Sequence, residues 1–220
     1  DIVASQIRLL DHLGVSRLYA VIGASMGGMM ALELAATRPE RVRLVVSIAS
    51  GLEVSPLQRI HNLEQIVAIE NDPNFRGGNY YDGPLPLQGL VLARIIAHKT
   101  YVSLLTMEDR ARGEIKRDYP LPDQYHLQTS LESYMLHQGY KFIERFDPNS
   151  YLRIIGAWQQ FDLARSTGAA SPREIFARCR EQEYLIFTIS SDVCFYPGEQ
   201  AALLSALQEA GVATHDITVN

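Results

Sequence analysis

A serine set among glycines, between a strand-like and a helix-like segment, constrains the fold of this chain more than any other feature. The segment reads GASMGG over residues 23–28, with Ser25 at its third position. The preceding run "RLYAVIG" (17–23) is typical of a short buried strand, and the following run "MGGMMALELAATR" (26–38) is typical of a helix. Such a sharp strand-to-helix turn holds a serine hydroxyl clear of the sheet edge, while glycine neighbours leave room where strand and helix approach.

The interpretations of this turn differ in what else they require. A Walker-type phosphate loop needs a Gly-Lys-Ser/Thr sequence, which is absent, and a dinucleotide fingerprint needs a glycine spacing that residues 23, 27 and 28 do not match. A structural glycine-rich turn with an incidental serine stays open as an alternative. We favour a G-x-S-x-G turn in which Ser25 is a nucleophile and the backbone N–H of Met26, at the helix N-terminus, stabilises an oxyanion.

The segments that flank the serine turn alternate between helix and strand. Residues 1–13 have the apolar spacing of a helix, and "VRLVVSIAS" (42–50) is a β-branched run typical of a strand buried on both faces. Near the other end, "EYLIFTISSD" (183–192) predicts a strand, residues 197–211 predict a helix, and "ATHDITVN" predicts a last strand. Strands joined through helices by short connections form parallel, right-handed units.

The middle of the chain shows helical segments and polar connections without a convincing strand. We predict a single helix over "LQGLVLARIIAHKTYVSLL" (87–105). A further helix over "SPREIFARCREQ" begins with a capping box, in which Ser171 and Glu174 lie three residues apart and Pro172 takes the first helical position.

These patterns predict the fold class and the domain organisation. The fold class is α/β, with a mostly parallel sheet core formed by residues 1–54 and 181–220. An all-helical insertion over residues 55–180 interrupts this core and is long enough to be a subdomain.

The bulk composition excludes several classes of protein. The 220 residues are 47% hydrophobic, which is enough for one sizeable core. A net charge of -5 and a pI of about 5.7 give no electrostatic reason to bind nucleic acid or an anionic membrane, and no apolar run reaches the roughly 18 residues of a membrane span. Two cysteines, Cys179 and Cys194, are too few for a disulfide scaffold and lack metal-ligand spacing, so we expect a cytoplasmic protein without a metal site.

A catalytic acid is expected at the tip of a late strand, because enzymes of the α/β-hydrolase type carry their triad in the order Ser, Asp or Glu, then His. Asp192 has this place, since it ends "LIFTISSD" and precedes the turn "VCFYP". A buried carboxylate there would orient an imidazole and stabilise its protonated form. The alternative is an aspartate that only makes a surface turn or caps the next helix.

None of the six histidines (12, 61, 98, 126, 137 and 215) has the position of the catalytic base. His215 comes closest, but it stands at the start of its strand, whereas the catalytic edge lies at the strands' carboxyl ends. We therefore expect the base beyond Asn220. The chain also begins inside a helix without Met and stops at a strand, so we expect a piece that is truncated at both ends.

Several segments together resemble the homoserine O-acyltransferase family, a branch of the α/β-hydrolases with a helical lid. They read "GASMGGMMALELAATRPERV", "DPNFRGGNYY", "GLVLARIIAHKTYVS", "ESYMLHQGYKFIERFDPNSYLRI" and "SSDVCFYP". The resemblance implies a ping-pong transfer in methionine biosynthesis. Ser25 would take an acetyl group from acetyl-CoA and pass it to the hydroxyl of homoserine, with no permanently bound cofactor and with a homodimer formed through the lid.

The same resemblance assigns two substrate-binding residues in the lid. Arg94 would hold the homoserine carboxylate as a bidentate partner, and Tyr101 would offer its hydroxyl to the polar end of the substrate. The two residues are seven apart, which places them on one face of a continuous helix. Their alternatives are a salt-bridged arginine and a tyrosine that packs between helices.

Other functions stay open. Ala24 stands where many members of the resembled family have glycine, so the acyl donor could be succinyl-CoA and the acceptor another alcohol, such as serine. A serine esterase on the same scaffold is a second class of function, and a non-catalytic interaction role of this piece is a third. The helical insertion and Arg94 favour the transferase.

Overall fold

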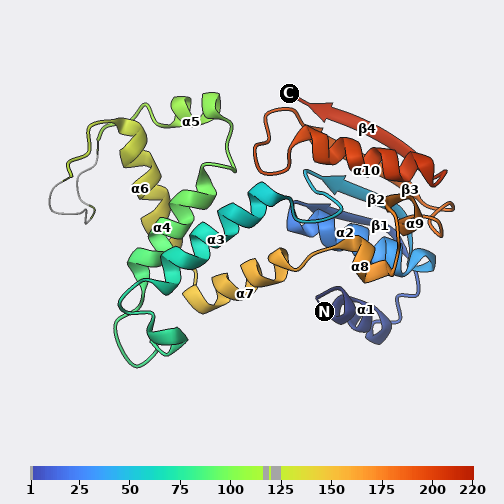
Figure 1. Ribbon diagram of the computed structural model, residues 1–220, viewed down its shortest axis with the longest axis horizontal. Coiled ribbons are helices and arrows are strands. Elements are labelled where there is room, and N and C mark those ends of the chain that lie inside the picture. The colour runs from blue at the N-terminus through green and yellow to red at the C-terminus, as the bar shows by residue number, and fades with distance from the viewer. Residues whose placement is uncertain (1, 116–118, 120–124) are drawn as a thin grey trace. The chain divides into compact units, whose positions relative to one another are not determined.

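The computed structural model of the protein describes residues 2–115, 119 and 125–220, and its contacts divide the chain into two compact units (Figure 1). Residues Asp1–Val54 and Gln160–Asn220 form the first, which we call the sheet unit. Residues Ser55–Gln159 form the second, which we call the helical unit.

The sheet unit is built on a four-stranded sheet in which every neighbouring pair of strands is parallel. Its strands, in spatial as well as chain order, are β1 (Leu18–Ala24), β2 (Val42–Ile48), β3 (Glu183–Ile189) and β4 (Ala213–Val219). Because the strands are parallel, their carboxyl ends meet at one edge, where Ala24 is opposite Ile48 and Ile48 is opposite Phe187. The parallel α/β architecture expected from the sequence is confirmed.

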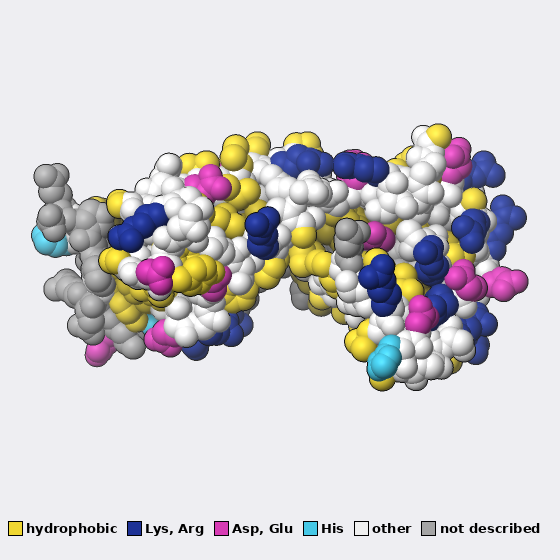
Figure 2. Space-filling view, turned by 90° about the horizontal axis from the view of Figure 1, so that it is seen from below, with side chains coloured by type: hydrophobic (Ala, Val, Ile, Leu, Met, Phe, Trp, Pro, Cys, Tyr) yellow, Lys and Arg dark blue, Asp and Glu magenta, His cyan; other side chains and the backbone are white. Residues whose placement is uncertain are grey.

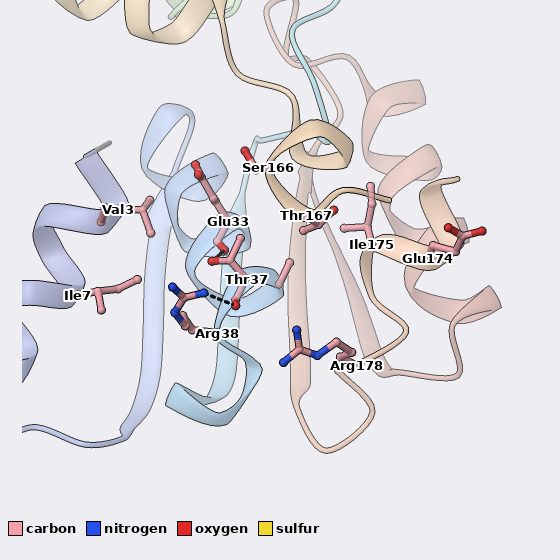
Figure 3. A pocket seen from close by; sticks show the side chains of 12 residues that line it. Val3, Ile7, Glu33, Thr37, Arg38, Ser166, Thr167, Glu174, Ile175 and Arg178 are labelled. Atoms are coloured by element: carbon pink, nitrogen blue, oxygen red, sulfur yellow. Dashed lines mark hydrogen bonds between the residues drawn. The ribbon is translucent and has the colours of Figure 1, made fainter. Parts of the chain in front are cut away.

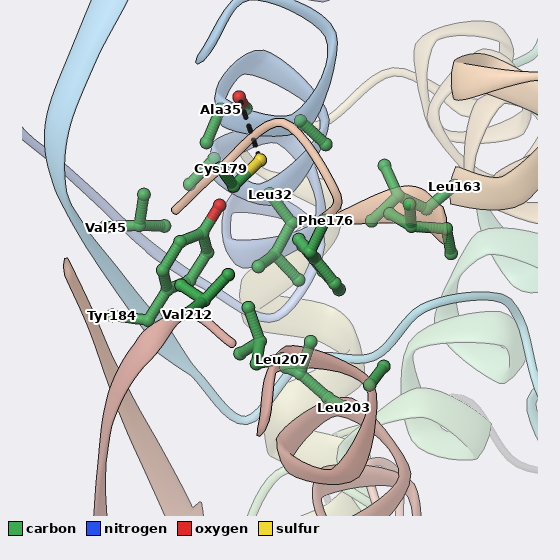
Figure 4. Packing of buried hydrophobic residues seen from close by; sticks show 14 of the residues in the cluster. Leu32, Ala35, Val45, Leu163, Phe176, Cys179, Tyr184, Leu203, Leu207 and Val212 are labelled. Carbon is green, nitrogen blue, oxygen red and sulfur yellow. Dashed lines mark hydrogen bonds between the residues drawn. The ribbon is translucent and has the colours of Figure 1, made fainter. Parts of the chain in front are cut away.

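Helices of the sheet unit pack on the strands to form its core. They are α1 (Ile2–His12), α2 (Met26–Thr37), the short 3-10 helix η1 (Pro39–Arg41), α8 (Leu163–Thr167), α9 (Pro172–Ile175) and α10 (Pro197–Glu209). Helix α2 packs against β1 and β2, and α10 packs against β3 and β4. Figure 4 shows Leu32 of α2, Leu203 and Leu207 of α10, Phe176 and Tyr184 converging in this core, and all five are fully buried. Each such side chain contributes about 1.5–3 kcal/mol by burial.

One buried amide ties the start of β3 to the connection between α2 and β2. The Gln182 Nε2 lies within hydrogen-bond distance of three backbone carbonyls, those of Ala35 (3.2 Å), Pro39 (3.0 Å) and Val42 (3.3 Å). Its Oε1 accepts a 2.7 Å bond from the Tyr184 hydroxyl, and burial raises the pKa of that phenol well above its usual value. The network supplies a donor to carbonyls around the connection between α2 and β2, and the Ala35 carbonyl also accepts from the Cys179 thiol at 3.8 Å.

The helical unit surrounds one central helix. Its elements are α3 (Pro56–Glu70), the 3-10 turn η2 (Arg76–Gly78), α4 (Leu87–His98), α5 (Leu104–Arg110), α6 (Ser130–Ile143) and α7 (Pro148–Gln159). Helix α4 packs between α3 and α6, and a glycine lies at each crossing. A Cβ on Gly89 would lie 2.5 Å from the Ala68 carbonyl oxygen, and one on Gly139 would lie 2.8 Å from Val91 Cγ1. These glycines therefore allow the close approach of α4 to both neighbours.

The segment 160–180, which the sequence analysis assigns to the helical insertion, groups with the sheet unit instead. Helix α8 packs on α2, and α9 packs on α10. Leu163 is fully buried in the sheet unit's core, and its N–H donates a 2.9 Å bond to the Leu52 carbonyl. The helical unit thus ends at Gln159 because the short helices that follow complete the sheet unit's core.

The single helix expected over 87–105 is wrong, because α4 ends at His98 and α5 begins at Leu104. Turn-like bonds close the end of α4, where the Tyr101 N–H donates to the His98 carbonyl at 3.1 Å. Ser103 then caps α5 by accepting a 3.3 Å bond from the Thr106 N–H. A good N-cap in mid-segment starts a new helix rather than extending the old one.

The capping box expected at Ser171 is also wrong. The helix there, α9, is a single turn, and the Ser171 side chain makes no capping hydrogen bond. The Glu174 carboxylate reaches past it and accepts a 3.0 Å bond from the Ala170 N–H.

Charged side chains of both signs are interspersed over the face of the molecule that Figure 2 shows. Within the described ranges, no helix combines the length and the apolar character that a membrane crossing requires. The same residues contain no group of three or more His, Cys, Asp or Glu side chains placed to hold a metal ion.

Candidate active site

Ser25 lies between β1 and α2 in a backbone conformation that serine rarely adopts, with φ 54° and ψ −126°. Its N–H donates a 2.9 Å bond to the Ile48 carbonyl, and its carbonyl accepts a 3.1 Å bond from the Met29 N–H. A non-glycine residue at positive φ costs of order 1–3 kcal/mol, and such strain concentrates at functional sites. The side chain is exposed and makes no capping bond to the helix, so the hydroxyl is presented rather than used in folding.

Two of the glycines around Ser25 are required by space, and one is not. A Cβ on Gly23 would lie 2.0 Å from the Gly27 carbonyl oxygen, and a Cβ on Gly28 would lie 2.7 Å from Ser50 Cβ. Nothing lies within 4 Å of the place where a Cβ on Gly27 would stand. The tight turn therefore depends on Gly23 and Gly28, whereas the last glycine of G-x-S-x-G is not needed for packing.

Met26 is the first residue of α2. The first N–H groups of a helix have no acceptor within the helix and carry its partial positive charge, so this amide is available to a negative oxygen. Met26 as the oxyanion donor stays a prediction.

Asp192 lies in the turn that follows β3 and is half-buried. Its Oδ1 accepts hydrogen bonds from the N–H groups of Cys194 (2.7 Å) and Phe195 (2.8 Å), which is the turn-forming role named above as the alternative. Because both bonds go to one oxygen, Oδ2 is the oxygen that can accept from a further donor. The turn role and the proposed catalytic role therefore use different atoms of one carboxylate.

Ser25 and Asp192 lie at the same edge of the sheet, since they follow the carboxyl ends of β1 and β3. These strands have β2 between them, so they are about 10 Å apart, a span that one imidazole can bridge. His215 is at the opposite end, where its Nε2 lies 2.9 Å from the Glu183 carboxylate, and His12 precedes β1. Among the described residues of the sheet unit, no histidine therefore reaches the serine edge.

The helical unit brings Arg94 and Tyr101 together, although not on one helix. The Arg94 guanidinium carbon lies 5.2 Å from the centre of the Tyr101 ring and 4.7 Å from that of Phe142. Tyr101 reaches the guanidinium from the turn after α4, and its side chain is half-exposed. Sequence reasoning missed Phe142 because it comes from α6, far along the chain, and no local pattern marks the contact.

Tyr151 lies in the electrostatic surroundings of the same pair. Burial raises the pKa of Tyr151, the neighbouring Tyr101 raises it further, and the positive charge of Arg94 opposes the shift. The Tyr151 hydroxyl donates a 2.5 Å bond to Gln65 Oε1. Tyr151 thus acts as a buried support beside Arg94, held by an amide of α3.

Three histidines of the helical unit, His98, His137 and His61, contact polar side chains of the same unit. His98 is buried with Nε2 3.1 Å from the Tyr134 hydroxyl, and burial together with Arg94 and Arg110 lowers its pKa. His137 Nδ1 lies 2.6 Å from the Tyr119 hydroxyl, and His61 Nδ1 lies 3.4 Å from the Glu64 carboxylate.

A cavity of about 390 Å³ lies in the sheet unit, but away from Ser25 (Figure 3). It is lined by residues of α1, α2, α8 and α9, with the guanidinium groups of Arg38 and Arg178 near one end and the Glu33 side chain toward the other. Arg38 follows the C-terminus of α2, roughly 20 Å along the helix from Ser25. The cavity is therefore not part of the serine site.

Comparisons with known proteins bear on this arrangement. The model of the alpha/beta hydrolase fold family matches residues 1–207. The homoserine O-acetyltransferase of Solidesulfovibrio magneticus is 38% identical over 216 residues, which cover 96% of this chain and 53% of that protein. The chain spans about half the length of the curated relatives it matches. The resemblance to the homoserine O-acyltransferases stated above is confirmed at this level of identity.

Solved structures of two activities share the fold. A homoserine O-acetyltransferase from Bacillus anthracis matches with a TM-score of 0.87 and 23% identity, over 99% of this chain and 57% of that one. An acetylester hydrolase from Corynebacterium glutamicum matches with a TM-score of 0.79 and 24% identity, over 99% and 58%. At these identities the likeness shows the architecture and not the reaction. The parallel sheet, the strained serine turn and the family match agree, and the chain belongs to the alpha/beta hydrolase fold family.

Proposed function

We propose that the chain carries the nucleophile of an O-acyltransferase that moves an acetyl group from acetyl-CoA to the side-chain hydroxyl of L-homoserine. The observation that carries this proposal is the exposed Ser25 side chain, held at φ 54° between β1 and α2. The curated relatives at 36–40% identity bear the name homoserine O-acetyltransferase, which supports this acceptor and this acyl group.

In the first half of the reaction, the Ser25 hydroxyl attacks the thioester carbonyl and its proton passes to a histidine. The resulting oxyanion accepts a hydrogen bond from the Met26 N–H. The carbon–sulfur bond then breaks, the thiolate takes the proton from the histidine, and an acetyl ester remains on Ser25. The Asp192 carboxylate would orient that histidine through Oδ2. The proposal needs a histidine that the described residues of the sheet unit do not bring to this edge.

In the second half, homoserine replaces the free thiol. Its hydroxyl gives a proton to the histidine and attacks the ester, and Ser25 regains its proton as the acetylated product leaves. Arg94 would hold the substrate carboxylate, and Tyr101 would contact its polar end. Support comes from the helical unit, where two aromatic rings fix the Arg94 guanidinium and none of the ion pairs among the described residues engages it.

A serine esterase is the second candidate, and the acetylester hydrolase of the same fold favours it. The two activities differ in whether water or homoserine resolves the acyl-serine. A donor such as succinyl-CoA, or another acceptor such as serine, stays open because Ala24 next to the nucleophile differs from the usual glycine.

The test uses the whole protein with acetyl-CoA and L-homoserine, and follows thiol release together with the formation of O-acetylhomoserine. We expect thiol release to depend on homoserine and to disappear in Ser25→Ala. Ser16→Ala, which removes an exposed hydroxyl before β1, is the matched control and should retain full activity. Equal thiol release with and without homoserine would favour the esterase, and an active Ser25→Ala variant would remove the nucleophile assignment.

The proposal includes a homodimer through the helical unit, and helix α3 supports it. This helix exposes Ile60, Leu63 and Val67, at 53%, 56% and 44%, while its buried positions are the polar Gln58, Asn62 and Gln65 together with Ile69. An apolar stripe facing outward favours association with another surface. Light scattering of the whole protein should give the mass of two chains. The Leu63→Glu variant should give the mass of one chain.

We also propose that the enzyme works in the cytoplasm. Both cysteines, Cys179 and Cys194, are buried, and a chain with only two cysteines suits a reducing compartment. Acetyl-CoA is a co-substrate in this proposal, and no permanently bound cofactor takes part.

A further inference from the structure

A second cavity, of about 370 Å³, lies wholly within the helical unit and is rich in positive charge. Its lining residues are Arg94 of α4 and, from α6 and the residues just after it, Gln138, Lys141, Phe142, Glu144 and Arg145. The lining therefore holds three basic side chains against one acidic side chain.

Among the described residues, none of the three basic side chains has a carboxylate partner. None of the ion pairs between described residues includes Arg94, Lys141 or Arg145, even though Glu144 lines the same cavity. The Nε of Arg94 is buried and has no hydrogen-bond acceptor among the described residues. Three like charges in one cavity repel one another, and a buried donor without a partner costs free energy, so the arrangement gains most from an anionic ligand.

Phe142 holds the cations in place. Its ring centre lies 4.7 Å from the Arg94 guanidinium carbon and 5.8 Å from that of Arg145, and the ring itself is buried. Lys141 in the last turn of α6 and Arg145, two residues after the helix, both line the cavity. Gly139 lets α6 lie close against α4, so the two sources of charge are fixed relative to each other.

We propose that this cavity binds phosphate groups of the acyl donor, with Arg94, Lys141 and Arg145 as the phosphate ligands. The assignment rests on the proposed transferase function and deepens it. Three cations exceed what the single charge of an amino-acid carboxylate requires, whereas coenzyme A carries a 3′-phosphate and a diphosphate. Guanidinium forks and a lysine ammonium are the side chains that phosphate oxygens favour. A plain esterase has no use for such a site.

Arg94 serves both substrates in this account. In a ping-pong reaction the donor leaves before the acceptor binds, so one guanidinium can meet a phosphate in the first half and a carboxylate in the second. Lys141 and Arg145 have no part in holding homoserine, and they are therefore the residues to test.

The first experiment compares two donors that carry the same thioester, acetyl-CoA and acetyl-pantetheine, on the whole protein. Lys141→Gln and Arg145→Gln should each lower kcat/KM for acetyl-CoA by about tenfold, the scale of one charge-assisted hydrogen bond. Acetyl-pantetheine lacks the phosphates, and its kcat/KM should change less than twofold. Arg153→Gln, an exposed arginine of α7 outside the cavity, is the matched control and should leave both donors unaffected.

The second experiment needs no chemistry at Ser25. Calorimetry with adenosine 3′,5′-bisphosphate should show binding to the wild-type protein and about tenfold weaker binding to each variant, with recovery in Lys141→Arg. This result would support the cavity even if no transfer to homoserine were found, so the two proposals fail separately. Equal losses with both donors, a matching rise in KM for homoserine, or bisphosphate affinity unchanged by the substitutions would overturn the assignment.

Discussion

The sheet unit and the helical unit prepare chemistry in opposite ways. In the sheet unit the backbone does the positioning, because φ 54° at Ser25, the close approach at Gly23 and the parallel strand ends place the reactive groups. In the helical unit side chains from separate helices do it, since Arg94 of α4 is held by Phe142 of α6 and by Tyr101 of a turn. The first kind of site can be recognised from a short sequence motif, whereas the second forms only when separate helices pack together.

The prediction with the largest expected effect concerns Asp192. It tests whether the hydrogen bonds that this side chain accepts in its turn can be kept while its proposed catalytic role is removed. Asp192→Asn should lower kcat of the whole protein by about 10³–10⁴-fold, because an amide Nδ2 cannot accept the imidazole N–H. The thermal midpoint should stay within about 2 °C of the wild type, since the amide oxygen can still accept from the Cys194 and Phe195 N–H groups. A large fall in the midpoint would show that the two roles share one oxygen, and unchanged kcat would remove Asp192 from the triad.

The second prediction tests how far the sheet unit depends on a single polar side chain. Gln182→Leu should lower the free energy of unfolding by about 2–4 kcal/mol, because it leaves carbonyls of the α2–β2 connection and the Tyr184 hydroxyl without their partner. Urea denaturation measures the change. Gln208→Leu, an exposed glutamine of α10, is the control and should stay within about 0.5 kcal/mol. A loss as small as that of the control would mean that water replaces the Gln182 amide.

The third prediction concerns Arg94 in the helical unit. Arg94→Met should raise KM for homoserine by about 10–100-fold, the scale of a bidentate charged contact, while Ser25 is still acylated by 4-nitrophenyl acetate at an unchanged rate. The KM for homoserine reports substrate binding by the helical unit, and the acylation rate reports nucleophilic chemistry in the sheet unit. Impairment of both in Arg94→Met would contradict this assignment of roles to the two units. Arg153→Met is the control for removal of a positive charge.

The smallest effect concerns pH and the helical unit alone. Burial, with Arg94 and Arg110 nearby, lowers the pKa of His98 below its ordinary 6.5. As the pH falls below about 6.5, the unfolded chain binds this proton before the folded chain does, so stability should fall by at most about 1.4 kcal/mol per pH unit. Above about pH 7 this contribution is constant.

Urea denaturation at pH 7.5 and pH 5.5 measures that dependence. His98→Gln should reduce the difference between the two pH values, whereas His215→Gln, at an exposed position of β4, should not. An identical pH dependence in His98→Gln and the wild type would show that other groups are responsible.

The same contrast explains what the sequence could predict. Strand runs such as 42–50 and the G-x-S-x-G turn are local signals, and the structure forms β1, β2 and α2 where they indicate. The break after His98 was missed because Thr100 and Tyr101 fit a helical period, while a capping serine at 103 outweighs it. The assignment of residues 160–180 failed because burial of Leu163 against distant residues, which no local pattern records, decides it.

The open space beside Gly27 has a practical consequence for protein engineering. A Cβ added there would meet no atom of another segment within 4 Å, and Gly27 lies within α2 without a positive φ. A methyl group can thus be introduced two positions after the nucleophile by a single codon change, with the bend that presents the hydroxyl left intact. Residue 27 is accordingly a natural first position for a mutant library around the nucleophile.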